Sequence, residues 1–349
     1  MGTLFAVLIL GIIIMFHEFG HFLLAKLNGI CVLEFSLGMG PRLISFEKGG
    51  TRYSFKILPF GGSCMMLGED ERDDDPGAFG NASVLARISV VAAGPIFNFL
   101  LAFALSLILV GVTGYSEPTV RGIIPGLPAE AAGVQAGDVI RKINGRSVHS
   151  FEDVTTYIYT HPNRELDITW QRTGTDGSRE TFRAVLVPEY SADSGRYLMG
   201  VEFDGRPKPV ENPIQLMVHS AYEVQYWIRY VFDSFYMMFH GLVSVNDISG
   251  PVGIVTTIDE TVDQAAPAGA LAVLLTLLQL CVLLSANLGV MNLLPIPALD
   301  GGRLVFLLLE AVRRKPIDKE KEGMVHMAGM MVLLALMVLI LFNDMRKLL

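Results

Sequence analysis

Charged residues are scarce in this sequence. Only 18% of its 349 residues are Asp, Glu, Lys or Arg, whereas 51% are hydrophobic, and the mean hydropathy is +0.46. This composition excludes an ordinary soluble enzyme and is typical of a membrane protein. The formal net charge is −8 and no basic cluster suggests nucleic-acid binding, which argues against a nucleic-acid-binding protein.

Cysteine is also rare. Cys31, Cys64 and Cys281 lie far apart and form no C-x-x-C pair. This pattern excludes a disulfide framework or a structural Cys-zinc site, and we interpret all three as small buried apolar residues. The first apolar run lacks the basic residues and the small-x-small site of a cleaved signal peptide, so we predict a retained membrane helix.

A metal-binding pattern lies inside that first apolar run, GTLFAVLILGIIIMFHEFGHFLL. His17 and His21 are four residues apart, so a helix presents both imidazoles on one face. Two imidazoles at this spacing suit zinc, and Glu18 beside the first can act as general base on water at the metal. Because His and Glu are costly to bury in a membrane, a locally satisfied polar cluster is the weaker explanation.

Four segments are apolar and long enough to span a bilayer. We predict membrane helices over Thr3–Lys26, Ile88–Val112, Leu271–Leu294 and Val325–Phe342. The link between the last two carries six basic residues, which places it in the cytoplasm by the positive-inside rule. Counting the four spans back from this link predicts that the His17/His21 end of the first helix faces the cytoplasm and that both termini lie outside.

A catalytic zinc usually takes three protein ligands. Asp300 is the best candidate for the third, because it lies at the cytoplasmic end of the third span. Gly301 and Gly302 behind it let the backbone turn sharply. His326, at the mouth of the fourth span, is the rival candidate.

Two asparagines have open roles. Asn292 could donate a hydrogen bond to the substrate backbone or to the developing oxyanion, or it could cap the broken helix before Pro295. Asn98 in the second span must find a partner inside the membrane, and a purely structural hydrogen bond is at least as plausible as a catalytic role.

The segments outside the spans differ in character. Residues 30–67 contain β-prone runs around Gly49-Gly50, which predicts a hairpin that lies against or dips into the bilayer. Residues 115–206 are soluble and β-rich, with a helix expected at Phe151–Thr160. Pro213–Val245 is aromatic and interrupted by charges, so we interpret it as an amphipathic helix at the membrane surface; a helix packed on the β-rich module is the alternative.

Several motifs together resemble the site-2 protease family of intramembrane zinc metalloproteases. They are HEFGH in the first span, GPIFN in the second, GPVGI at 250–254, NLLPIPALDGG, and AGVQAGDVIRKINGRSV, which resembles part of a bacterial PDZ domain. The sequence is most similar to the bacterial PDZ-containing type that regulates sigma factors. This resemblance implies that His17, His21 and Asp300 bind zinc, that Glu18 is the catalytic base and that Asn292 contacts substrate. It also implies that residues 30–67 clamp an unwound substrate as an added strand.

The expected fold is an α-helical membrane protein plus one extracytoplasmic PDZ domain. The membrane part has about four transmembrane helices and a membrane-associated β-hairpin segment. The expected domains are an N-terminal membrane part, the PDZ domain, an amphipathic interfacial helix region and a C-terminal membrane part, over residues 1–114, 115–206, 207–250 and 251–349.

The resemblance implies a function in the bacterial cytoplasmic membrane. Such enzymes cleave the transmembrane segments of single-span proteins, for example anti-sigma factors or remnant signal peptides, after a prior cut outside the membrane. The implied partners are these substrates, a peptide ligand of the PDZ domain and the lipid bilayer, with no nucleic acid. The competing hypothesis is a catalytically silent scaffold that presents its PDZ domain; the intact set of His17, Glu18, His21 and Asp300 argues against it.

Overall fold

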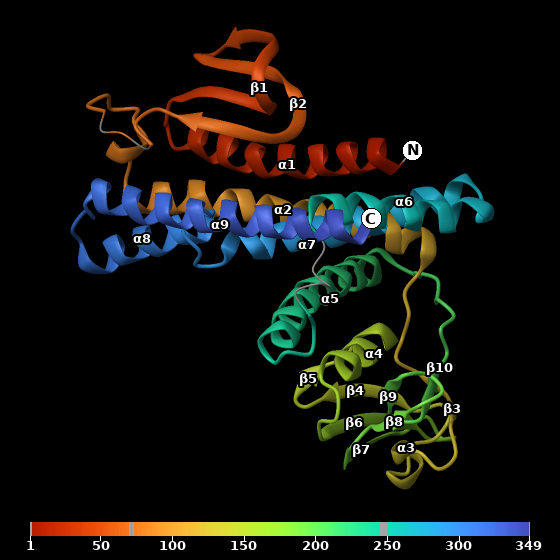
Figure 1. The fold of residues 1–349 in the computed structure, drawn as a ribbon. Coiled ribbons are helices and arrows are strands. Elements are labelled where there is room, and N and C mark those ends of the chain that lie inside the picture. Colours follow the sequence, from red (N-terminus) through yellow and green to blue (C-terminus); the bar gives the residue numbers. More distant parts are fainter. Residues whose placement is uncertain (1, 70, 72, 245–249, 349) are drawn as a thin grey trace. The chain divides into compact units, whose positions relative to one another are not determined.

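The computed structural model describes residues 2–69, 71, 73–244 and 250–348. The chain divides into two compact units. The first combines Met1–Leu105 with Val245–Leu349, and the second is Ser106–Ser244. Helix α2 (Val84–Thr113) runs through the boundary, and each unit is described separately below (Figure 1).

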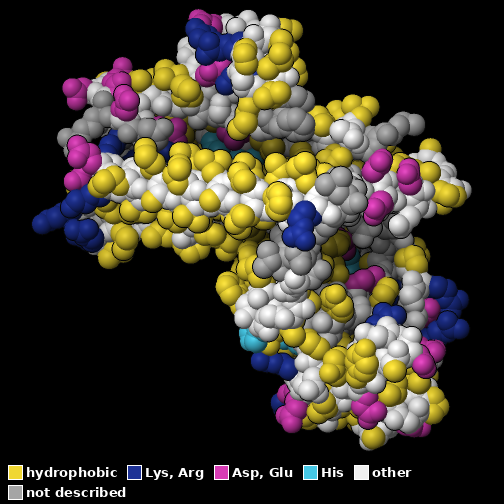
Figure 2. Space-filling model, viewed as in Figure 1, with side chains coloured by type: hydrophobic (Ala, Val, Ile, Leu, Met, Phe, Trp, Pro, Cys, Tyr) yellow, Lys and Arg dark blue, Asp and Glu magenta, His cyan; other side chains and the backbone are white. Residues whose placement is uncertain are grey.

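Four helices are long and apolar enough to cross a membrane: α1 (Gly2–Leu27), α2, α7 (Ala270–Leu293) and α9 (Lys319–Leu348). Each exceeds the ~20 residues that span the hydrocarbon. In the first unit, hydrophobic side chains cover the long helices, and charged side chains gather at one end of α9 (Figure 2). The four spans predicted from hydropathy are therefore confirmed as helices, and the chain is a multi-pass membrane protein.

A β-hairpin follows α1. Strands β1 (Val32–Lys48) and β2 (Thr51–Met66) pair antiparallel around the predicted turn at Gly49-Gly50. The hairpin folds back on itself, because Phe35 pairs with both Cys64 and Tyr53. Segment 32–37 thus has a strand on each side, whereas within the described residues segment 62–66 is paired on one side only.

Two amphipathic helices of the first unit were not predicted. Helix α6 (Pro251–Ala265) packs against α1 and α7 through Ile258 and Val262. Helix α8 (Asp300–Arg313) occupies the link that was expected only to carry basic residues. Both are too short and too polar to give a membrane-span signal, and packing on neighbouring helices stabilises them. Short 3₁₀ turns at Phe79–Asn81 and Ala266–Ala268 complete this unit.

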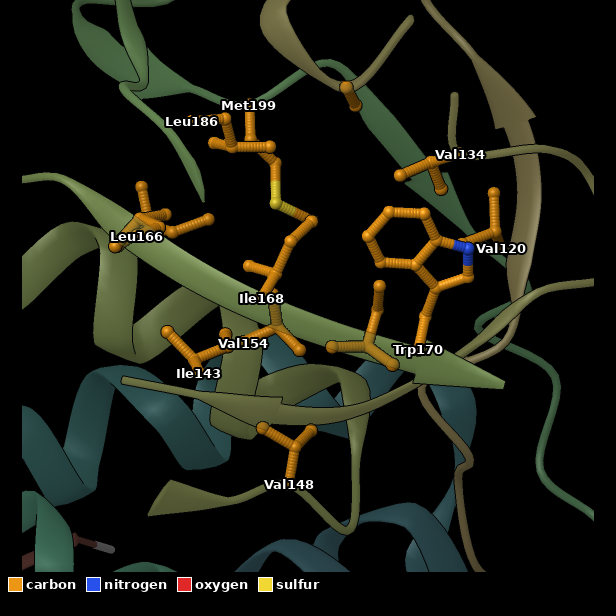
Figure 3. Packing of buried hydrophobic residues seen from close by; sticks show 13 residues of the cluster. Val120, Val134, Ile143, Val148, Val154, Leu166, Ile168, Trp170, Leu186 and Met199 are labelled. Carbon is orange, nitrogen blue, oxygen red and sulfur yellow. The ribbon is translucent and has the colours of Figure 1, made fainter. Parts of the chain in front are cut away.

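The second unit is a small β-rich module with its own hydrophobic core. A sheet of order β5-β4-β6-β7 is accompanied by the pairs β10-β3 and β8-β9. Figure 3 shows Trp170 and Ile168 of β6 packed with Val154 of α4. The elements are β3 (Val120–Ile123), α3 (Pro128–Ala131), β4 (Val139–Ile143), β5 (Arg146–Ser147), α4 (Phe151–Thr160), β6 (Leu166–Thr173), β7 (Arg179–Leu186), β8 (Glu189–Ser191), β9 (Arg196–Leu198) and β10 (Val201–Phe203).

Helix α5 (Pro213–Phe239) has two different faces. One face packs on the module: Arg146 Nη1 donates to both carboxylate oxygens of Asp233 at 2.9 and 2.7 Å, and Tyr222 stacks on His149. Apolar side chains remain exposed elsewhere on α5, including Ile214 and Phe232. The helix predicted over Pro213–Val245 is thus present and packed on the module; Val245 itself lies outside the described residues.

Candidate active site

Helix α1 brings the two histidines together as their spacing predicts. His17 and His21 are both buried, and their Nε2 atoms lie 3.2 Å apart. The apolar run around them forms one uninterrupted helix that ends at Leu27, where Gly29 adopts a positive φ of 74°. The helix therefore presents two imidazole nitrogens at one point in the membrane span.

Asp300 reaches the same point from far along the chain. It is the first residue of α8, which follows the turn after Pro295, and its Oδ2 lies 3.2 Å from His17 Nε2 and 3.4 Å from His21 Nε2. Gly301 and Gly302 permit this approach, because a Cβ at Gly301 would lie 2.1 Å from the carbonyl oxygen of Leu294. The structure therefore brings together the three residues that were expected to bind metal.

The spacing of these donor atoms fits zinc. Two ligands placed 2.0–2.1 Å from a tetrahedral zinc lie roughly 3.3 Å apart. The three separations here are 3.2, 3.2 and 3.4 Å. His21 Nδ1 lies 2.9 Å from the carbonyl oxygen of Val90, to which it donates, because a carbonyl can only accept. In the neutral ring, Nε2 of His21 then carries the lone pair that a metal requires.

Glycines let α1 and α2 cross closely at this site. A Cβ at Gly20 would lie 2.5 Å from the carbonyl oxygen of Ala93. A Cβ at Gly94 would lie 2.3 Å from His21 Nε2 and 2.7 Å from His17 Cε1. Gly94, the glycine of GPIFN, therefore forms part of the wall of the proposed metal site. Because neither glycine has a side chain, the two helices can pack as closely as small residues predict.

The side chain of Glu18 extends from α1 towards strand β2 of the hairpin. Its carboxylate interacts with the backbone N–H of Cys64 in β2. A Cβ at Gly62 would come within 2.9 Å of Glu18 Cγ. Figure 1 shows the hairpin lying along α1, so the edge segment 62–66 runs past the expected general base.

The two asparagines also lie at the site. Asn98 is fully buried, and its Nδ2 is 3.1 Å from His17 Nδ1. Its main-chain oxygen accepts a hydrogen bond of 2.8 Å from the hydroxyl of Ser285 in α7. The amide of Asn292 lies 3.5 Å from His17 Nε2.

His326 contacts the turn that precedes α8. Its Nδ1 accepts a hydrogen bond of 2.9 Å from the backbone N–H of Ala298. Among the described residues, the group that could hold a metal contains Asp300 and does not contain His326. The rival candidate for third ligand is thus placed as a support of the turn.

Cys64 lies close to Glu18 without offering a thiolate ligand. Burial raises the pKa of the Cys64 thiol, and the nearby carboxylates of Glu18 and Glu69 raise that pKa further. Among the described residues, the group that could hold a metal does not include Cys64.

Some parts of the site had no signal in the sequence. The carbonyl of Val90 and the close approach of Gly62 to Glu18 come from backbone placement, which residue type does not reveal. Asn98 carried a signal, since it is a polar residue inside an apolar span, but its partner could not be inferred from a single sequence.

Known proteins are similar to this chain along nearly its whole length. Residues 5–336 match the model described as peptidase family M50. A protein of Clostridium acetobutylicum named as a zinc metalloprotease is 39% identical over 97% of this chain and 96% of its own length. The regulator of sigma-W protease RasP of Bacillus subtilis is 29% identical over 98% of this chain and 97% of its own.

The zinc metalloprotease RasP of Shouchella clausii is 31% identical over the full length of both chains. The family that the HEFGH and NLLPIPALDGG motifs indicated is thereby confirmed, and with it the assignment as a zinc metalloprotease. The chain belongs to peptidase family M50.

Proposed function

We propose that this chain is an intramembrane endopeptidase whose zinc is held by His17, His21 and Asp300. The observation that carries the proposal is the convergence of three donor atoms, from α1 and α8, at separations that match a tetrahedral zinc site. Bound zinc supplies Lewis-acid polarisation of the scissile carbonyl and acidifies water.

Glu18 is the proposed general base. Its carboxylate takes a proton from the attacking water and passes it to the leaving amine nitrogen of the cleaved peptide bond. The contact with the backbone N–H of Cys64 holds the carboxylate against β2. This support fixes the base relative to the hairpin as well as relative to the metal ligands.

The substrate is proposed to bind as an added strand along segment 62–66. Backbone groups on an unpaired strand edge bind an extended peptide by adding it to the sheet. Segment 62–66 has a described strand partner on one side only, and Gly62 lies against Glu18. Asn292 is proposed to donate to the substrate backbone or to the developing oxyanion, and the 3.5 Å separation between its amide nitrogen and His17 Nε2 supports this role.

The proposed substrates are single-span membrane proteins already shortened outside the membrane, such as anti-sigma factors or remnant signal peptides. The name of the Bacillus subtilis relative, a regulator of sigma-W protease, supports this class. The six basic residues between the third and fourth spans support a cytoplasmic-side active site, with the module of residues 115–206 outside a bacterial cytoplasmic membrane.

The module is proposed to be a PDZ domain that binds a peptide. A groove of about 480 Å³ lies against α4 and β10, lined by Thr155, Ile158, Tyr159, Val201 and Phe203 among others. Strand β10 pairs with β3 alone in the described sheet, which leaves its other edge for an added strand. The exposed apolar residues of α5 support the proposed contact of residues 207–250 with the bilayer surface.

Glu18→Gln tests the proposal against the scaffold hypothesis. The amide keeps the size of the side chain but cannot accept the proton, so we expect cleavage to fall by about 10²–10⁴-fold with zinc still bound. The assay measures bound zinc and cleavage of a labelled single-span substrate in both proteins. If wild type and Glu18→Gln bind zinc and neither cleaves, the scaffold hypothesis is favoured.

A further inference from the structure

The side chain of Asn98 faces the ring nitrogen of His17 that points away from the metal site. In the structure, Asn98 Nδ2 lies 3.1 Å from His17 Nδ1, and Asn98 Oδ1 is buried without a hydrogen-bond partner. The two ends of an amide are distinguished only by their hydrogen-bonding partners. The orientation with Nδ2 towards His17 leaves Oδ1 unpaired, so the two ends of the amide have to be assigned from the chemistry of the ligand.

The chemistry of the ligand decides it. If the amide donates to Nδ1, the hydrogen of the neutral ring sits on His17 Nε2, the atom that lies 3.2 Å from Asp300 Oδ2. A ring in that form has no lone pair for a metal at Nε2. Zinc binding requires the hydrogen on Nδ1, and the atom facing Nδ1 must then be an acceptor.

We infer that Asn98 is a positioning residue whose side-chain oxygen accepts a hydrogen bond from Nδ1 of His17 and so fixes the tautomer that binds zinc. This inference rests on the proposed zinc site. Helix α2 then holds both ligand rings in the same way: the carbonyl oxygen of Val90 accepts from His21 Nδ1, and the amide oxygen of Asn98 accepts from His17 Nδ1.

If the amide accepts from His17 Nδ1, a side chain that can only accept should preserve zinc affinity. If the amide donates, such a side chain should lower zinc affinity. Asn98→Asp keeps an oxygen at the position and cannot donate, whereas Asn98→Leu has a similar size and can do neither. Loss of such an orienting partner typically lowers metal affinity 10–100-fold. We therefore expect Asn98→Leu to bind zinc about 10–100-fold more weakly and Asn98→Asp to bind it no more weakly than wild type.

Ser285→Ala is the matched control. It removes a buried hydrogen bond to the main-chain oxygen of Asn98 and leaves the side chain and His17 untouched. Its zinc affinity should equal that of wild type. The affinities are measured on the full chain in detergent, at one pH, by competition with a chelator of known zinc affinity.

Three outcomes would overturn the inference. Equal zinc affinity of Asn98→Leu and wild type would show that the contact does not matter, and equal weakening by Asp and Leu would show that the amide donates. If the metal-free forms of both variants melt well below metal-free wild type, Asn98 supports the helices and not the ligand. Failure of wild type itself to bind zinc would instead reject the proposed function.

Discussion

Single residues set how closely α1 and α2 approach. Gly20 and Gly94 lie where the helices cross, and each leaves no room for a methyl group. Because the ligand rings fill the same space, the glycines shape the metal site as directly as the ligands do. A packing residue here also shapes the proposed metal site.

Gly94→Ala should damage zinc binding more than it damages the fold. The added methyl would lie 2.3 Å from His21 Nε2, so the ring must move away from Asp300. We expect zinc affinity to fall at least tenfold, the low end of the range for disturbed ligand orientation, when measured by chelator competition. Gly111→Ala in the same helix is the control, because its methyl meets only Leu216 Cδ1 at 3.8 Å; equal loss in both would contradict the argument.

Sequence patterns predicted which residues come together at the proposed metal site better than they predicted the surroundings of that site. The spacing of His17 and His21 and the position of Asp300 at a span end follow from helix geometry and from charge bias between spans. The supports of the site, such as the carbonyl of Val90, come from the packing of distant helices. That packing leaves no trace in residue type, so one sequence could not reveal it.

Among the elements, α5 contacts several separate parts of the second unit. Arg229 donates to the carbonyl of Ser147 at 2.8 Å, and the hydroxyls of Tyr226 and Thr156 lie 3.0 Å apart. Its first turns also meet Tyr115, just after the end of α2, through Gln215 Nε2 at 2.7 Å. Within the second unit, the helix therefore contacts both the β-rich module and Tyr115 in the segment that follows α2.

Asp233→Ala should loosen α5 from the module. The variant leaves Arg146, which is 21% exposed, without its carboxylate partner. Hydrogen bonds to charged groups contribute about 1.5–3 kcal/mol, so hydrogen exchange along α5 should accelerate about tenfold or more. Arg206→Ala breaks the exposed pair with Asp204 and serves as the control, with no expected change. Unchanged exchange in Asp233→Ala would mean that other contacts alone hold the helix.

Acidification should lower the stability of the second unit, Ser106–Ser244. Burial lowers the pKa of His149, His161 and His219; for His161 the nearby Arg164 and Arg146 add to this effect, while Asp233 opposes it. Above about pH 7 these rings are neutral whether the unit is folded or not, and its stability is complete. Below about pH 6.5 the unfolded chain takes up protons before the folded unit does, so the free energy of unfolding falls.

Hydrogen exchange of the second unit at pH 7.5 and 5.5, corrected for intrinsic rates, measures this effect. Protection should be lower at pH 5.5. His161→Phe keeps an aromatic ring against Tyr157 and Tyr236 and should flatten the dependence. Greater protection at pH 5.5 would contradict the prediction.

For the whole molecule, the strongest apolar patterns predicted three of the four long helices to within four residues, whereas α9 extends six residues beyond the predicted Val325–Phe342 at each end. The helix at Phe151–Thr160 was predicted to the residue, and in the structure Ser150 and Asp153 form a capping box at its start. Helices α6 and α8 were missed, since short amphipathic helices depend on the surfaces that they cover. The folding back of the hairpin was missed because register follows from long-range pairing.

The whole molecule also constrains its substrate. A helix hides its peptide bonds, so cleavage at a site flanked by segment 62–66 requires local unwinding of the substrate. Helix-breaking Gly or Pro near the cleaved bond should favour cleavage. Replacing these residues by Leu in a model span should slow its cleavage several-fold, with Leu replacements far from the cleaved bond as the control. An unchanged rate would reject the proposed unwinding.

Helix α9 makes few contacts along its length. None of its most apolar window is buried within the chain. Its contacts are concentrated at a few positions, where Asp344 accepts from the backbone N–H groups of Gly250 and Gly253 and where Gly329 packs on Pro297. Substitutions in α9 should therefore be tolerated at positions without contacts to the rest of the chain and selected against at positions with such contacts. The exposed positions Met331 and Leu336 should tolerate substitution by any apolar residue, while Gly329 and Asp344 should not tolerate substitution.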